Sequence, residues 1–205
     1  MKKTICFVLI LCFCLFPFIL KNCFAQAEQQ SKDKEQISEL YVYSDQDDPK
    51  NHYYPSEKIG DNADLEITEG CKDAPQVGND CIKVTYKAKG DYGWAGVYWV
   101  NPSGNWGNKK GGYDLRFAKK LSFWVKGEKG NELIAVFRFG GVKGTFSDSD
   151  IHGIGPIVLT NQWKQYVIDV SKRNMRYISA GFGFALTKAH NLEGCIFYID
   201  DVKYE

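Results

Sequence analysis

Aromatic side chains are concentrated in one short stretch of the sequence, GWAGVYWVNPSGNW (93–106), which holds three of the five tryptophans. Trp124 and Arg138 stand in two further apolar segments, LSFWVKG and ELIAVFRFG. Flat aromatic rings can stack on a ligand, and a guanidinium group adds charged hydrogen bonds. The alternative is that the same rings form the interior of a sheet protein.

Alternation divides these segments into two faces, because successive side chains of a strand point in opposite directions. One row of each segment suits the space between two sheets: Ala95, Val97 and Trp99; Leu121, Phe123 and Val125; Ala135, Phe137 and Phe139. The opposite rows place Trp94 and Tyr98, with Trp124 and Arg138, on an outer face as a predicted ligand-binding group. Trp106 lies in a loop, as a platform at the rim of that face or as a plug over its end.

Acidic and histidine side chains suggest a second kind of chemistry. Asp148, Asp150 and His152 alternate along FSDSDIHGIGP, so an extended segment would point them the same way. Recognition of ligand hydroxyl groups, calcium binding and catalysis are the functional interpretations, and a solvated loop is the alternative. The stretch SDQDDPKNHYYPS (44–56) lacks the glycine and terminal glutamate of an EF-hand loop, so that motif is rejected.

Motifs of common enzyme classes are missing from the sequence. It contains no GxSxG elbow, no HExxH pair, no Walker loop and no dinucleotide fingerprint. A catalytic pair of carboxylates depends on tertiary structure, so an enzyme remains an alternative to a binding protein.

The cysteines indicate an exported protein. Four of the seven precede residue 26, and Cys71 and Cys81 flank a turn-rich loop that a disulfide would close. The alternative is two reduced thiols. Cys195 lies in the apolar run GCIFYID and is expected to be a buried small side chain.

The amino terminus has the features of a secretion signal over residues 1–25: two lysines, a long apolar run and small residues before a cleavage position. An uncleaved anchor is the alternative. Residues 26–39 are polar and predict a flexible linker. After cleavage behind residue 25, the mature chain of 180 residues would have a net charge of −2, because the cleaved segment contains three lysines and no acids. We therefore expect a secreted or periplasmic monomer that binds neither nucleic acid nor, beyond the signal, a membrane.

Residues 40–205 predict an all-β fold. About ten short β-branched or aromatic runs are separated by glycine, proline, asparagine and aspartate, and no long segment has a helical period. The expected strands are 40–44, 64–68, 81–88, 94–100, 121–127, 132–140, 156–159, 163–170, 177–186 and 195–204. Without alternating helices, this pattern favours an antiparallel β-sandwich of the jelly-roll kind.

Three stretches, YDLRFAKKLSFWVKGEKG, WKQYVIDVSK and FYIDDVKYE, resemble strands of carbohydrate-binding modules with a galactose-binding-like jelly roll, most closely family 11. The resemblance implies non-catalytic binding of a polysaccharide or oligosaccharide, such as a β-glucan, on the predicted aromatic face. It also implies a structural calcium ion held by Asp200 or Asp201, with Asp45 as a second contributor; a lysine partner such as Lys203 is the alternative. A glycan-degrading lyase or glycosidase and a surface-assembly domain that binds protein remain alternative functions.

Overall fold

The computed structural model describes residues 38–56, 58–73 and 75–205. The predicted signal (1–25) lies outside the described residues, as does the predicted linker (26–39) apart from its last two positions. In the described residues the chain forms strands and two short 3-10 helices, and no helix is long and apolar enough to cross a membrane. The elements in chain order are β1 (Leu40–Tyr43), β2 (Tyr54–Pro55), β3 (Ile59–Gly60), η1 (Asn62–Asp64), β4 (Leu65–Cys71), β5 (Cys81–Tyr86), β6 (Trp94–Val100), β7 (Lys120–Gly127), β8 (Leu133–Ile134), β9 (Val136–Gly140), β10 (Ile151–Ile154), β11 (Ile157–Val158), β12 (Lys164–Asp169), β13 (Ala180–Thr187), η2 (Lys188–His190) and β14 (Cys195–Tyr204).

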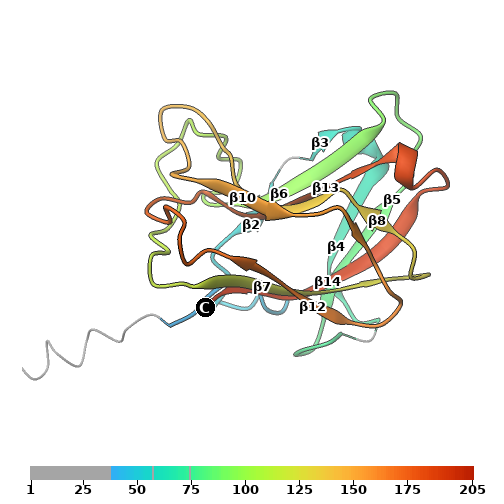
Figure 1. The fold of residues 1–205 in the computed structure, drawn as a ribbon, viewed down its shortest axis with the longest axis horizontal. Helices are drawn as coiled ribbons and strands as arrows, with labels where there is room; N and C mark the ends of the chain where they lie inside the picture. Colours follow the sequence, from blue (N-terminus) through green and yellow to red (C-terminus); the bar gives the residue numbers. More distant parts are fainter. Residues whose placement is uncertain (1–37, 57, 74) are drawn as a thin grey trace, which may run out of the picture. The chain divides into compact units, whose positions relative to one another are not determined.

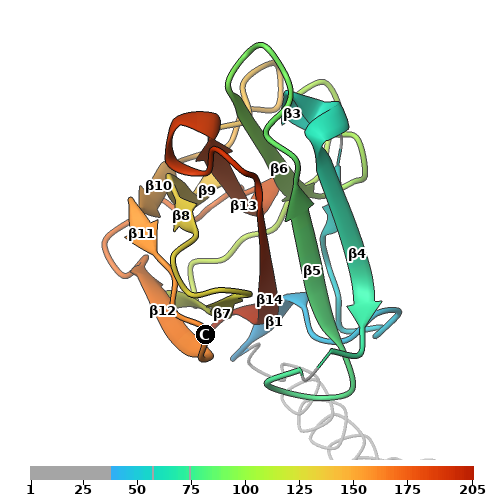
Figure 2. The same cartoon turned by 90° about the vertical axis from the view of Figure 1, so that its right-hand side faces the viewer.

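Most of these strands form two antiparallel sheets packed face to face, as Figure 1 shows, while β8 and β11 pair as a separate two-stranded sheet. Sheet A has the order β12–β7–β14–β5–β4, with β1 also paired to β14. Sheet B has the order β10–β9–β13–β6–β2, with β3 also paired to β6. Figure 2 shows β5 and β4 side by side at one edge of sheet A. The predicted antiparallel jelly-roll sandwich is confirmed.

Aromatic rings from both sheets fill the space between them. Phe123 of sheet A lies 5.0 Å from Phe137 and 5.0 Å from Phe182 of sheet B, measured between ring centroids. Trp99 has no exposed surface, and its indole nitrogen donates a hydrogen bond to Glu69 (3.1 Å). Because all these rings are removed from water, this interface is the main source of hydrophobic stabilisation.

The structure departs from the expected strands in two places. Ala135 is not on the inward row, because the expected strand is interrupted there: β8 ends at Ile134 and β9 begins at Val136. Ile134 is fully buried instead. The strand β10 forms within the segment expected to be an extended loop, where Gly153 pairs with Arg138 of β9. The strand has only four residues, one of them a glycine, and Gly155 and Pro156 follow it, so composition alone did not indicate a strand.

Candidate ligand-binding groove on sheet B

The residues of β6 lie on the two sides of sheet B in the alternation that the sequence predicts. Ala95, Val97 and Trp99 have no exposed surface and belong to the core between the sheets. Trp94 and Tyr98 lie on the outer side, where Trp94 is 39% exposed and Tyr98 only 7%. The two predicted rows are therefore confirmed, but Tyr98 is covered by neighbouring side chains and is not an open platform.

Trp124 lies on the opposite face of the sandwich from the other members of the predicted group. It belongs to β7 in sheet A, whereas β6 and β9 belong to sheet B. Each sheet turns its outer row away from the other sheet, so the two outer faces point in opposite directions. The structure brings Trp94, Tyr98 and Arg138 to one face and separates Trp124 from them.

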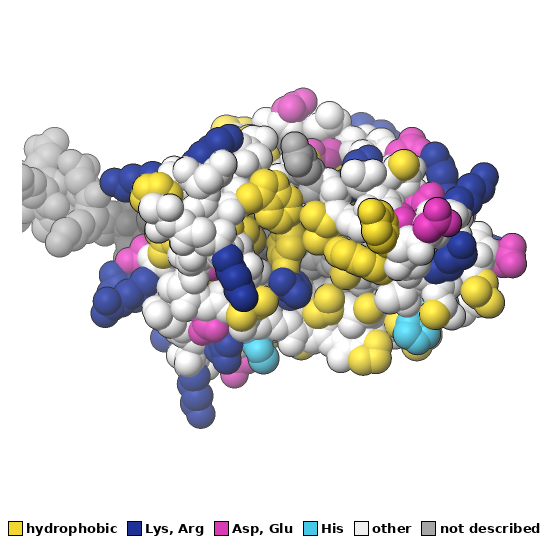
Figure 3. Space-filling view, turned by 90° about the horizontal axis from the view of Figure 1, so that it is seen from above, with side chains coloured by type: hydrophobic (Ala, Val, Ile, Leu, Met, Phe, Trp, Pro, Cys, Tyr) yellow, Lys and Arg dark blue, Asp and Glu magenta, His cyan; other side chains and the backbone are white. Residues whose placement is uncertain are grey.

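Small residues form a floor between Trp94 and Tyr98. These two residues are four positions apart on β6, or about 13 Å, with Gly96 midway between them. On the neighbouring β13, Gly183 pairs with Tyr98 and Ala185 pairs with Gly96. A Cβ atom added at Gly183 would lie 2.5 Å from Cδ1 of Tyr98, so the tyrosine ring rests against the bare strand. We call this hollow the sheet B groove; Figure 3 shows hydrophobic side chains gathered in a hollow on this side of the molecule, beside basic groups.

Trp106 covers one end of the sheet B groove. Its ring meets Tyr98 edge-on at 6.2 Å between centroids, and Val142 is buried beside them. The loop after β6, which carries Trp106, is joined to the loop after β9 by a hydrogen bond from Phe146 N–H to Gly107 O (2.9 Å). Both loops rise beyond sheet B in Figure 1. Trp106 is therefore half-buried against Tyr98 and also lies at the rim of the groove.

Arg138 supplies the positive charge of the sheet B groove. Its guanidinium carbon lies 5.2 Å from the centroid of the Tyr98 ring, a cation–π distance. Its register neighbours on both sides are glycines, Gly153 on β10 and Gly183 on β13. Among the described residues no carboxylate lies within 4.0 Å of the guanidinium, and its buried Nε has no hydrogen-bond partner. Burial raises the pKa of Tyr98, and the nearby guanidinium charge opposes that rise.

Two exposed apolar residues at the edges of this face were missed by sequence reasoning. Tyr54 is 50% exposed on β2, in register with Val100, and Ile151 is 47% exposed on β10. The sequence signal for an open outer face here was the pair of segments HGIG and GFGF, in which Gly153 and Gly183 alternate with apolar residues. A strand that alternates glycine with large apolar residues is typical of a sheet with one packed face and one face approached closely by another group.

The three polar residues predicted to act together have separate roles in the structure. Asp148 is half-buried and accepts hydrogen bonds from backbone N–H groups of β13 and of its own loop, and burial raises its pKa. Asp150 forms an ion pair with Arg173 (2.6 Å). His152 is exposed on β10, in register with Phe139 and hence on the row opposite the groove. Both carboxylates hold loop backbone in place, so nothing in their contacts favours the catalytic alternative.

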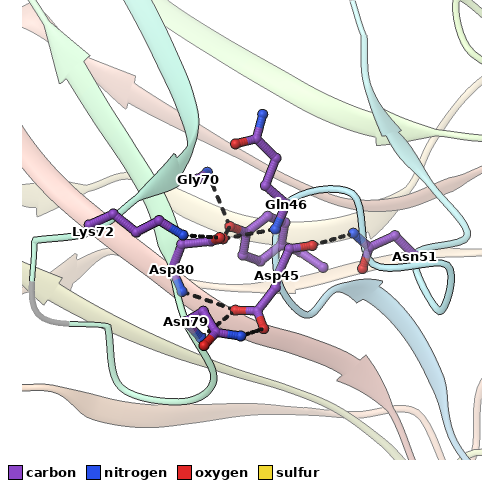
Figure 4. Close-up of polar contacts among 8 residues, drawn as sticks. Asp45, Gln46, Asn51, Gly70, Lys72, Asn79 and Asp80 are labelled. Atoms are coloured by element: carbon purple, nitrogen blue, oxygen red, sulfur yellow. Dashed lines mark hydrogen bonds and ion pairs between the residues drawn. The ribbon is translucent and has the colours of Figure 1, made fainter.

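Asp45, predicted as a calcium ligand, binds backbone N–H groups. Its carboxylate accepts hydrogen bonds from the N–H groups of Asn79 (2.7 Å) and Asp80 (3.0 Å). Asp80 in turn accepts hydrogen bonds from the Tyr43 hydroxyl (2.6 Å) and from the Lys72 ammonium (3.0 Å) (Figure 4). The two carboxylates together hold the loop between β4 and β5 against β1.

Asp200 holds the same loop from β14. It accepts hydrogen bonds from the N–H groups of Gln76 (2.7 Å) and Val77 (2.9 Å), and burial raises its pKa to about 6. Asp201 faces the ammonium group of Lys203 at 3.7 Å, the partner that the sequence offered as the alternative. Within the described parts of the chain, no three His, Cys, Asp or Glu side chains are grouped to hold a metal ion. The acids as placed do not fit a calcium site, so the calcium ion that the family resemblance implies is left to an experimental test.

The predicted disulfide between Cys71 and Cys81 is not formed, and both residues are buried free thiols. They are register partners across β4 and β5. Burial raises the pKa of Cys81 to about 12, which keeps it in the protonated form that does not attack a disulfide or metal. The loop they flank is closed instead by the carboxylate hydrogen bonds described above.

Solved structures that share this fold include carbohydrate-binding modules. A family 30 module matches with a TM-score of 0.53 and 12% identity, over 82% of this chain and 88% of the module. The family 30 module of a cellulosomal cellulase of Clostridium thermocellum matches with a TM-score of 0.52 and 12% identity, over 82% and 96%. A family 11 module from the same organism, in complex with a β-1,3-1,4-mixed-linked tetrasaccharide, matches with a TM-score of 0.47 and 16% identity, over 81% and 94%. No protein-family model and no curated protein matches the sequence. The chain thus has the jelly-roll sandwich fold of carbohydrate-binding modules.

Proposed function

We propose that this protein binds a polysaccharide or oligosaccharide without cleaving it, in the sheet B groove. The observation that carries the proposal is the combination of the exposed Trp94, the glycine floor and Arg138 on one outer face of the sandwich. A pyranose ring has an apolar face that stacks on an indole, and its hydroxyl groups need hydrogen-bond donors at the edge of the ring. The carbohydrate-binding modules that share the fold support this class of ligand.

Within this class of ligand, the family resemblance points to a β-glucan, so β-glucans are the first glycans to test. We also propose that the protein is exported, by means of the signal expected over residues 1–25, and meets its glycan in the periplasm or outside the cell. Export is tested by comparing the mass and location of the mature protein with those expected after cleavage behind Ala25.

The main test is retention of the protein on immobilised polysaccharides, with Trp94→Ala as the variant. We expect at least about a tenfold loss of affinity, because truncating an aromatic side chain at the centre of a binding site costs roughly 1–2 kcal/mol. Since Trp94 is partly exposed, the melting temperature should change little. Affinity is measured by affinity electrophoresis or calorimetry, and folding by a thermal melt.

The matched control is Trp124→Ala, which removes the same side chain from the outer face of the other sheet. It should leave glycan affinity unchanged. Equal losses in both variants, or no binding to any member of a broad glycan array, would contradict the proposed function. Capture of a protein by the wild type that Trp94→Ala abolishes, together with no glycan binding, would favour the surface-assembly alternative.

A further inference from the structure

The charged groups on the floor of the sheet B groove are few and of one kind. The strand residues on this outer face, taken from the register, are Tyr54 and Ile59 of β2 and β3; Trp94, Gly96, Tyr98 and Val100 of β6; Ala180, Gly183, Ala185 and Thr187 of β13; Val136, Arg138 and Gly140 of β9; and Ile151 and Gly153 of β10. This set contains one charged group, the guanidinium of Arg138, and no carboxylate or carboxamide. A surface of this composition has little to offer the many hydroxyl groups of a neutral sugar.

The two acids of the segment between β9 and β10 do not neutralise Arg138. Asp148 accepts hydrogen bonds from backbone N–H groups through both oxygens, and Asp150 is paired with Arg173 and with the N–H of Asn174. The register neighbours of Arg138 are glycines, and the described side chains near its guanidinium are the Tyr98 ring on which it stacks and the apolar Ile151. Among the described residues, the guanidinium therefore lies in an apolar hollow and forms no ion pair with a carboxylate.

We propose that the ligand of the sheet B groove is an acidic oligosaccharide, in which the carboxylate of one sugar pairs with the guanidinium of Arg138 while the ring of another sugar stacks on Trp94. This inference rests on the proposed function and names the chemical class of its ligand. A guanidinium presents a planar fork of N–H donors that matches a carboxylate, and the pair is strengthened where water is excluded. A neutral sugar laid over the same floor would offer the guanidinium only hydroxyl oxygens as acceptors, so its hydrogen bonds would be weaker and its charge would have no counterion.

The test compares acidic polysaccharides rich in uronic acid with the same polymers after chemical reduction of their carboxyl groups. Each pair has the same linkages and length and differs only in charge. We expect the wild-type protein to bind the native polymer at least about tenfold more tightly than its reduced form, the scale of one charged hydrogen-bonded pair. Raising the salt concentration should narrow the difference, because salt screens partly exposed charges.

Two variants locate the effect. Arg138→Gln should lose the preference for the native polymer, while Arg138→Lys, which keeps the charge but not the planar fork, should retain only part of it. The matched control is Lys126→Gln, which removes a cation stacked on Tyr198 (4.7 Å) on the outer face of sheet A. It should keep the wild-type preference. A thermal melt of each variant checks folding, and the wild-type comparison of native and reduced polymers needs no variant.

The inference is overturned if neutral glycans bind as tightly as their acidic counterparts, or if Arg138→Gln and Lys126→Gln weaken acidic binding equally. In either case binding of glycans that depends on Trp94 would leave the proposed function intact. If no glycan of either kind binds, the proposed function fails and the ligand class fails with it.

Discussion

The two outer faces of the sandwich carry the same kinds of side chain in different surroundings. On sheet A, Lys126 lies between two aromatic rings, 4.7 Å from the centroid of Tyr198 and 5.1 Å from that of Trp163. On sheet B, Arg138 lies between two glycines and meets a single ring, that of Tyr98. Each strand alone shows the same alternation of a large apolar row with an aromatic and basic row.

The neighbours on adjacent strands decide what each cation can do. Large rings on both sides of Lys126 cover its stem and surround its charge, so that face is packed with its own side chains. Glycines on both sides of Arg138 have no side chains that could cover the guanidinium, and the Tyr98 ring rests on one of them, Gly183. A ligand can therefore approach the cation on sheet B, whereas on sheet A the place is already taken by Trp163 and Tyr198.

Filling the floor of the sheet B groove should have the largest effect. In Gly183→Val the new side chain would meet the Tyr98 ring at 2.5 Å and the Val97 carbonyl oxygen at 2.7 Å. We expect the free energy of unfolding to fall by roughly 1–3 kcal/mol, as for other insertions into packed sites. Glycan binding should be lost, because Tyr98 must swing into the groove. Urea denaturation and affinity electrophoresis measure the two effects.

The matched control for that variant is Thr85→Val on the outer face of sheet A. It keeps a β-branched shape at a half-buried position, so its unfolding free energy should stay within about 0.5 kcal/mol of the wild type. Unchanged glycan affinity in Gly183→Val would show that the ligand does not occupy this floor.

The stability of the loop after β9, at the end of the sheet B groove, should depend on pH through Asp148. Burial raises the pKa of its carboxyl group, so the folded protein holds this proton more tightly than the unfolded chain does. Its contribution to stability is therefore greatest below the ordinary aspartate pKa and is lost as the pH rises through the folded value. We expect Asp148→Asn to remove this contribution to the pH dependence.

The measurement is the unfolding free energy of the wild type and of Asp148→Asn across the acidic range. The wild type should gain stability relative to the variant as the pH falls. Other buried acids such as Asp200 titrate in both proteins, so their effect cancels in the difference when the sites are independent. A difference that shrinks on acidification would show that Asp148 is held in its charged form by its amide partners.

Features set by neighbours in the sequence could be predicted from it, whereas features set by pairing between distant segments could not. The inward rows Ala95, Val97, Trp99 and Leu121, Phe123, Val125 were predicted correctly, because alternation within one strand determines which side chains share a face. The sheet to which each strand belongs depends on pairing between distant segments, so Trp124 was grouped with a face it does not share. The glycines beside Arg138 come from β10 and β13, and only the register brings them to it.

The acids were harder to interpret for a different reason. A carboxylate that anchors a loop and one that binds a ligand or an ion are the same residue in the same kind of turn-rich segment. Asp45 and Asp148 in loops, and Asp200 in β14, all accept hydrogen bonds from backbone N–H groups of loops. Composition identified where such groups gather but not what their oxygen atoms contact.

The smallest effect on stability is expected from adding calcium. This experiment tests whether the loop-anchoring carboxylates beside sheet A can also bind an ion. Because the carboxylate oxygens of Asp45 and Asp200 accept backbone N–H groups, an ion would have to displace those hydrogen bonds. We expect the melting temperature to be the same with added calcium and with a chelator. A calcium ion at a hundred times its dissociation constant would instead stabilise the fold by about 2.7 kcal/mol, which corresponds to a rise of several degrees. Such a rise in the wild type, absent in Asp200→Asn, would establish the calcium site that the family resemblance implies and would make these acids ligands as well as loop anchors.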